Sequence, residues 1–147
     1  MDTRWLLAQF ATSSALAGLC WTVQLGIYPR FAGLLEEGGT AAFRSFHAAY
    51  TRSMGFVAAP LMLVEAALAA VWLGDGFTIE AAAGMVMVVL VWVLTFGLIV
   101  PLHVRLQRVP SVSDARTVTQ LNWPRTLLWT ARAGLLGWAA AALLAHP

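Results

Sequence analysis

The feature that most constrains this chain is a succession of four long apolar stretches, which cover about residues 5–28, 54–73, 79–100 and 123–144. A helix that crosses a lipid bilayer needs about 20 mostly apolar residues. Only 11% of the residues are charged, whereas roughly a quarter are charged in a soluble domain. The sequence therefore predicts an all-α integral membrane protein, a four-helix bundle that forms a single domain over residues 1–147.

Prolines and glycines predict where the helices end. Pro29 and Pro101 are expected to end the first and third helices, because a proline inside a helix removes a backbone hydrogen bond. The pair Gly38-Gly39 predicts a turn, after which the second helix is expected to begin near Thr40. Because the apolar part of that helix starts only near residue 54, the second helix has an extended polar start.

The other two connections are shorter or more polar. Residues 72–77, WLGDGF, predict a tight turn between the second and third helices. Residues 109–120, VPSVSDARTVTQ, predict a polar loop in which Ser113 or Asp114 caps the fourth helix. Pro124 suits the first turn of that span, where its missing N–H does no harm.

The arginines predict the orientation of the bundle. The first connection holds Arg30, Arg44 and Arg52, and the third holds Arg105, Arg108 and Arg116. The middle connection holds only Asp75 and Glu80. By the positive-inside rule the first and third connections are cytoplasmic, so both termini face the outside and the extended start of the second helix is cytoplasmic. The arginines are scattered singly, which argues against a nucleic-acid partner.

Cys20 is the only cysteine, which excludes an internal disulfide and any multi-cysteine metal or redox motif. The apolar pattern around it continues to Ile27, too long for a signal-peptide core. Leu19 also stands where a lipoprotein signal has a small residue. We therefore expect this segment to be retained as the first helix.

Each apolar helix carries a polar stripe at helical spacing. In the last helix it consists of Asn122, Arg125, Trp129 and Arg132, at intervals of three and four residues. The other stripes are Ser13, Cys20, Gln24 and Tyr28 in the first helix, His47, Tyr50, Met54, Leu61 and Glu65 in the second, and Trp92, Thr95, Ile99 and His103 in the third. An ionisable group that faces lipid costs several kcal/mol. The stripes are therefore expected to face inward and to enclose one chamber.

Glu65 and Arg132 are predicted to form an ion pair. Counted along their helices from the cytoplasmic side, they lie about 16 Å and about 13 Å deep. A buried charge needs a partner, and each supplies what the other lacks. The pair has two readings, a structural ion pair that fixes the helix register and a substrate or proton site.

A second polar group is expected at the cytoplasmic mouth, and it consists of Tyr28, His47, Tyr50, His103, Asn122 and Arg125. His47 and Glu65 cannot share a metal ion, because they lie about 27 Å apart on a continuous helix. His47 and His103 can lie at the same level, so they are candidate ligands of a metal ion or haem. The simpler alternative is a pair of interfacial histidines that contact head groups or backbone. Tyr28, Tyr50 and Trp123 have a simpler reading as interfacial aromatics.

Several segments resemble a family of small bacterial four-helix inner-membrane proteins. They are YPRF (28–31), FHAAYTR (46–52), APLMLVE (59–65), WVLTF (92–96), VPLH (100–103) and LNWPRTLLWTAR (121–132). In layout the chain is also similar to the anthrone-oxygenase-like membrane proteins. The resemblance implies a bacterial inner-membrane location, makes His47, Glu65, His103, Asn122, Arg125 and Arg132 part of a family pattern, and raises an oxygenase function.

The leading functional prediction is a membrane oxidoreductase or oxygenase that acts on a lipophilic aromatic or quinone-like molecule. In this hypothesis His47, His103 and Arg125 are catalytic, with His47 or His103 as general base or as ligand of a metal or haem. The predicted substrate-binding residues are Tyr28, Glu65, Asn122, Trp123, Trp129 and Arg132. Two alternatives stay open, a small-anion or proton transporter gated by Glu65, and an accessory subunit of a larger membrane complex. A homo-oligomer is compatible with each.

Overall fold

The computed structural model describes residues 3–145 and is helical almost throughout. The elements are α1 (Thr3–Thr22), η1 (Val23–Ile27), α2 (Tyr28–Asp75), α3 (Ile79–Leu94), η2 (Thr95–Ile99), α4 (Val100–Arg108) and α5 (Val112–Ala145). No strand occurs in this described part of the chain. The predicted all-α class is confirmed.

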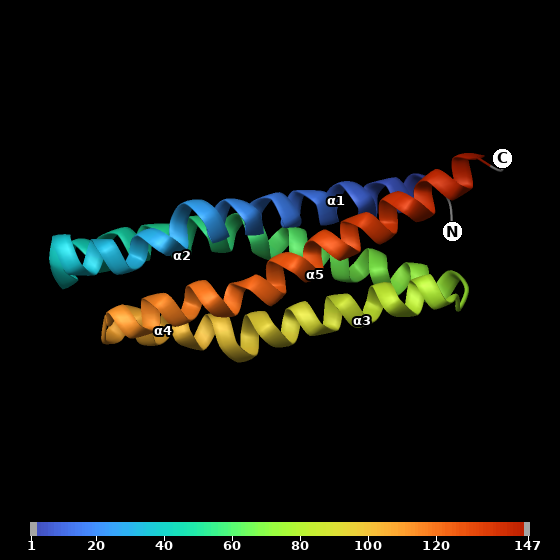
Figure 1. Ribbon diagram of the computed structural model, residues 1–147. Helices are drawn as coiled ribbons and strands as arrows, with labels where there is room; N and C mark the ends of the chain where they lie inside the picture. The colour runs from blue at the N-terminus through green and yellow to red at the C-terminus, as the bar shows by residue number, and fades with distance from the viewer. Residues whose placement is uncertain (1–2, 146–147) are drawn as a thin grey trace.

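Three helical stretches are long and apolar enough to cross a membrane, namely Thr3–Asp75, Ile79–Arg108 and Val112–Ala145. The first is interrupted at Gly39, whose φ of 73° and ψ of 176° lie in a region that essentially only glycine adopts. There the chain reverses and runs back beside itself (Figure 1), so that the rings of Phe31 and Phe43 lie 5.5 Å apart. The predicted turn at Gly38-Gly39 is confirmed. The stretch Thr3–Asp75 is interrupted at Gly39, and it gives two spans when the helices before and after Gly39 are counted separately. Only with that count does the total reach the predicted four.

The helix ends predicted at Pro29 and Pro101 are wrong, since the helices continue through both prolines. A wide π-helical turn precedes each one: Tyr28 N–H bonds to the carbonyl of Val23, and Val100 N–H to that of Thr95. Proline lacks an N–H and its ring clashes with the carbonyl four residues earlier. A π turn changes the local bonding register and accommodates both defects, so the helix does not break.

The fourth helix starts earlier than predicted. A tight turn joins the second and third helices as predicted, but it lies at residues 76–78 and not at 72–77, because α2 ends at Asp75 and α3 begins at Ile79. The polar loop, however, shrinks to residues 109–111, because α5 begins at Val112. Ser111, rather than Ser113 or Asp114, caps it, as its Oγ accepts from the N–H of Asp114 at 3.1 Å. Pro124 therefore lies inside α5 and not in its first turn.

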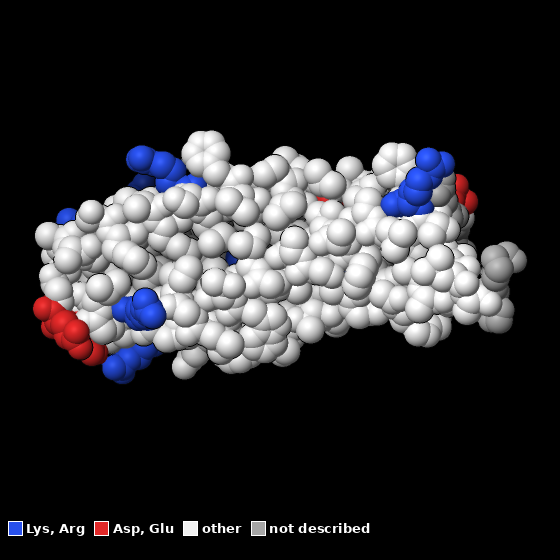
Figure 2. All heavy atoms as spheres, turned by 90° about the horizontal axis from the view of Figure 1, so that it is seen from above, with Lys and Arg blue, Asp and Glu red and all other residues white. Residues whose placement is uncertain are grey.

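Side chains divide the surface into apolar and charged zones. On the face drawn in Figure 2, arginine, aspartate and glutamate gather at the two ends, and the long middle is almost free of charge. Large apolar side chains are exposed midway along the helices, among them Phe56 (78%), Val93 (60%) and Leu127 (55%). In water such a surface would be costly, whereas it suits hydrocarbon.

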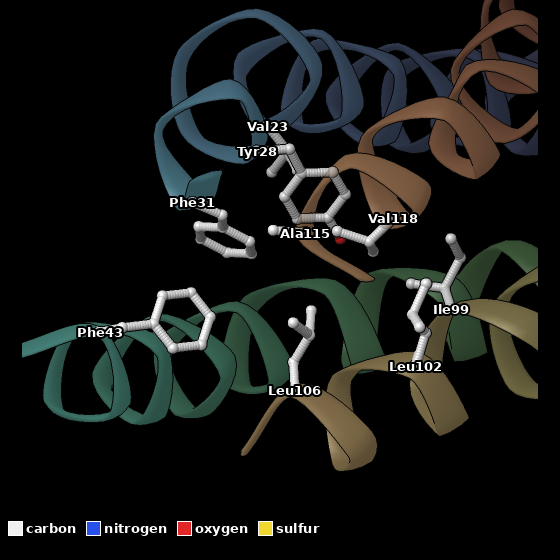
Figure 3. Close-up of a cluster of buried hydrophobic side chains, with 9 residues drawn as sticks. All are labelled: Val23, Tyr28, Phe31, Phe43, Ile99, Leu102, Leu106, Ala115 and Val118. Carbon is white, nitrogen blue, oxygen red and sulfur yellow. The ribbon is translucent and has the colours of Figure 1, made fainter. Parts of the chain in front are cut away.

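A cluster of buried apolar side chains occupies the end of the bundle nearest Gly39 (Figure 3). It consists of Val23, Tyr28, Phe31, Phe43, Ile99, Leu102, Leu106, Ala115 and Val118. These residues come from η1, α2, η2, α4 and α5, so the cluster ties both π turns to the remaining helices. It also fixes the ring of Tyr28, which is 1% exposed.

Candidate functional site

The predicted ion pair is present deep in the bundle. Nε of Arg132 lies 2.5 Å from Oε1 of Glu65, and both side chains are fully buried. The hydroxyl of Ser13 donates to the same carboxylate oxygen at 2.5 Å. Three helices, α1, α2 and α5, therefore meet at one carboxylate, as the matched depths of Glu65 and Arg132 predicted.

Two further residues shape the surroundings of Arg132. The amide oxygen of Gln9, turned toward the guanidinium, accepts from Nη2 at 2.8 Å. Gly84 of α3 gives Nη1 its space, because a Cβ at position 84 would lie 2.6 Å from it. Oε2 of Glu65 and Nη1 of Arg132 have no hydrogen-bond partner. Because both side chains are fully buried, Glu65 and Arg132 contact only residues inside the bundle.

The predicted histidine pair is also present, as part of a chain of hydrogen bonds. Nδ1 of His47 lies 2.8 Å from Oε1 of Gln107, and Nε2 of His47 lies 2.8 Å from Nδ1 of His103. Nε2 of His103 in turn lies 2.8 Å from the hydroxyl of Tyr28. Three elements, the two parts of α2 and α4, are linked in this way.

The carbonyl oxygen of Gln107 sets the direction of every bond in the chain. That oxygen can only accept, so Nδ1 of His47 carries a proton. In the neutral ring Nε2 of His47 is then an acceptor, and Nδ1 of His103 must donate to it. This leaves Nε2 of His103 to accept from the hydroxyl of Tyr28. With both rings neutral, these are the donor and acceptor roles that satisfy the chain, and they align the rings for proton transfer.

Packing and backbone geometry hold these rings in place. Phe43 stacks on His47 with ring centroids 5.2 Å apart, and Phe31 contacts His47 and His103 edge-on. The π turn η1 ends immediately before Tyr28, and η2 ends one helical turn before His103. Such turns shift the facing of the residues that follow them and are frequent at functional sites.

The two histidines do not fit a metal ion or haem iron in this arrangement. All four ring nitrogens are engaged by Gln107, Tyr28 or the other ring. Over residues 3–145 no group of three or more His, Cys, Asp or Glu side chains could hold a metal ion. The ligand role predicted for His47 and His103 would require a ring to give up one of these hydrogen bonds.

A cavity of about 650 Å³ lies beside the histidine chain. Its back wall is buried and comes from α1, η1 and α5, through Leu16, Cys20, Val23 and Trp129. Tyr28, His47, Tyr50 and His103 line it at the end nearest Gly39. The volume is within the range of roughly 300–1,000 Å³ of small-molecule sites. The wall is mainly apolar with a few polar groups, as is common in such sites.

Arg125 projects into this cavity without a carboxylate beside it. Its Nη2 lies 3.6 Å from Sγ of Cys20, and its buried Nε has no hydrogen-bond partner. Two other polar groups in the cavity wall are also unpartnered, Nε1 of Trp92 and the hydroxyl of Thr95. These three atoms are enclosed by the side chains around them and have no partner among the described residues.

Four of the predicted site residues do not line the cavity. Glu65 and Arg132 form the separate ion pair. Asn122 is buried in another network, where its Nδ2 donates to Oε1 of Gln24 at 2.9 Å. Trp123 is 40% exposed and packs edge-on against Trp21. The predicted single chamber is thus one cavity with two polar networks outside it. His47, His103, Arg125, Tyr28 and Trp129 are the predicted residues that line the cavity.

Sequence reasoning missed three residues that complete these networks, Gln9, Gly84 and Gln107. Gln9 precedes Ser13 by four residues, and Gln107 follows His103 by four, so helical spacing could have identified both. Gly84 carries no such signal, because its role is the space that it leaves for Arg132.

Comparison with protein-family models, with curated proteins and with solved structures found no match to this chain. The family resemblance of the sequence segments therefore stays a prediction.

Proposed function

We propose that this protein is an integral protein of the bacterial inner membrane that binds a lipophilic aromatic or quinone-like molecule in the 650 Å³ cavity and acts on it as an oxidoreductase or oxygenase. The proposal rests on one observation, a mainly apolar cavity on which a tyrosine–histidine chain and an arginine converge. Proton transfer and charge stabilisation at one apolar site are what oxidation of a phenolic or quinol-like molecule requires.

The membrane location has two supports. The described helices include three that are long and apolar enough to span a bilayer, and their exposed middle carries large apolar side chains. Charges gather at the ends, which suits the water-facing zones (Figure 2). In our proposal the two parts of α2 are separate helices, which gives four spans with both termini outside the cytoplasm.

The roles of the residues follow from the hydrogen-bond directions. A proton released by the bound molecule passes to Tyr28 as the phenol gives its own proton to Nε2 of His103. His103 then transfers a proton from Nδ1 to Nε2 of His47. Arg125 stabilises negative charge on an oxygen of the bound molecule. Dioxygen is the co-substrate in our proposal: it accepts the electrons, and the proton held on His47 returns along the chain to the reduced oxygen, so that no charge remains on the histidines.

A test of the proposal is whether the cavity holds a lipophile. We would purify the protein in mild detergent, extract it and identify bound lipophiles by mass spectrometry. Ala58 lines the cavity, so Ala58→Phe should displace the bound molecule. Ala70, exposed on the same helix and away from the cavity, provides the matched control Ala70→Phe. A lipophile retained equally by both variants, or absent from the wild-type protein, would refute the proposal.

The ion pair is assigned a structural role in this proposal. Glu65 and Arg132 are each 0% exposed and lie outside the cavity. A gate for anions or protons needs a titrating group in contact with the transported species. Liposome flux measured with the wild-type protein and with Arg132→Ala would show a difference only if the pair served transport.

A further inference from the structure

The cavity wall carries one permanent charge, that of Arg125. Among the residues that line it, no aspartate or glutamate occurs, and the other ionisable side chains are cysteine, tyrosine and histidine. Glu65 forms its ion pair with Arg132 and does not line the cavity. A cation with little access to water is stabilised by an anion, and the described residues place none beside Arg125.

The unpartnered atoms point the same way. Nε of Arg125 and Nε1 of Trp92 are both donors, both are buried, and both lack an acceptor. Arg125 contacts Cys20, and Trp92 packs against the apolar cluster to which Cys20 belongs. Buried donors of this kind are rare. Both atoms are shielded from the cavity in this conformation, so the Arg125 side chain, which lines the cavity, is the group that a bound acceptor oxygen can contact.

The opening of the cavity is apolar and faces sideways. α2 approaches α3 and α4 closely but not η2, so the wall is incomplete at the level of the π turn. The exposed residues around this opening are Gly55, Ala59 and Leu63 on α2 and Phe96, Val100 and Val104 on η2 and α4. These side chains are apolar, and they surround an opening at the middle of the helices. A ligand can therefore enter from the hydrocarbon of the bilayer.

From these observations we infer that the lipophilic molecule of the proposed function is an anionic amphiphile: it enters between α2 and η2, its aromatic or quinone-like part is its apolar part, and it places an acidic oxygen group against Arg125. The back wall holds the head group, because Arg125 lies on α5 beside α1. The apolar tail extends toward the opening. A carboxylate and a phosphate monoester share the required chemistry, since guanidinium binds both.

This inference rests on the proposed function, because it names the class of molecule that the cavity binds. We would reconstitute the protein in nanodiscs of phosphatidylcholine and titrate it with 11-(dansylamino)undecanoate or with its methyl ester. Energy transfer from tryptophan to dansyl reports binding, and Trp92 and Trp129 both line the cavity. The ester differs from the acid only in the charge and the methyl group of its head.

The wild-type protein should bind the acid at least about tenfold more tightly than the ester, as a charge-assisted hydrogen bond predicts. Arg125→Gln should abolish this preference while leaving the affinity for the ester unchanged, and Arg125→Lys should restore part of it. The control Arg52→Gln removes an exposed arginine that does not line the cavity, and it should keep the full preference.

Equal binding of acid and ester by the wild-type protein would overturn the inference but leave the lipophile-binding cavity standing. Binding of neither probe would overturn both. If Arg125→Gln does not fold, the wild-type comparison of acid and ester still decides. Competition by hexadecanoate and by hexadecyl phosphate then shows which of the two head groups the site prefers.

Discussion

Replacing Glu65 with leucine should lower the free energy of unfolding by about 3–5 kcal/mol, the usual cost of leaving a buried charge without its partner. The structure gives this magnitude its basis. Both Glu65 and Arg132 are 0% exposed, and the carboxylate accepts from Arg132 and from Ser13 through the same oxygen. Without it, Arg132 keeps only the amide oxygen of Gln9 as an acceptor.

A double variant distinguishes the contribution of the ion pair to stability from the cost of leaving one charge without its partner. Glu65→Leu combined with Arg132→Met removes both charges, and a buried pair replaced by apolar side chains is often neutral in stability. Ser13 then loses its acceptor, at a cost of about 1–3 kcal/mol, whereas the amide oxygen of Gln9 keeps the N–H of Ala69 at 2.9 Å. The double variant should therefore be no less stable than either single variant, far from the sum of the two.

Unfolding in mixed micelles with increasing dodecyl sulfate, followed by helical circular dichroism, would measure these differences. The exposed pair of Glu36 and Arg116, with side chains 52% and 68% exposed and an N···O distance of 3.3 Å, provides the control. Glu36→Leu should change stability by less than about 1 kcal/mol. If Glu65→Leu proved as mild as Glu36→Leu, or if the double variant showed additive losses, the reasoning about the buried pair would be refuted.

Three further substitutions test single features of the fold by the same unfolding assay. Gly84→Ala should destabilise by about 1–3 kcal/mol, because its Cβ would lie 2.6 Å from Nη1 of Arg132, and the same substitution should cost much less when it is made in the Arg132→Met variant. Gly39→Ala should cost about 1–3 kcal/mol, since φ is 73° there; Gly33→Ala, which meets nothing within 4 Å, should not. Ser111→Ala should cost about 1 kcal/mol through the lost helix cap, and restoration by Ser111→Asp would separate capping from other effects.

The ion pair of Glu65 and Arg132 could be predicted from helical spacing alone. Its two members share the inward stripes of different helices, and counting 1.5 Å per residue put them at nearly equal depth. Two charges buried at one level leave few alternatives to pairing, so the structural contact was predictable. The histidine pair followed from the same kind of count, since His47 and His103 both lie near the same end of the bundle.

The prolines show where such reasoning fails. Pro29 and Pro101 ended helices in the prediction because an interior proline normally costs a hydrogen bond. In the structure the π turns η1 and η2 offset that cost, and each helix continues beyond its proline, as far as Arg108 in α4 and as far as the break at Gly39 in α2. No pattern in the sequence distinguishes a proline that ends a helix from one that follows a π turn, because the choice depends on packing around it.

The division of the polar residues among separate networks could not be predicted from the sequence either. Inward stripes on four helical segments predict one polar interior, but they do not say which side chains pair and which are left over. Glu65 forms an ion pair with Arg132, and Asn122 donates a hydrogen bond to Gln24. The only hydrogen-bond partner of Arg125 among the described residues is the sulfur of Cys20. Which buried arginine lacks a carboxylate partner therefore depends on which side chains the packed helices bring together.

By itself, then, the sequence determined the helical class, the apolar spans, the reversal at Gly39 and the inward direction of the polar residues, because these depend on composition and on spacing along one helix. The tertiary structure alone decided the continuation through the prolines, the partner of each polar group and the cavity that opens between α2 and η2. The physical reason is that pairing and empty volume arise from distances between helices, which no single helix encodes.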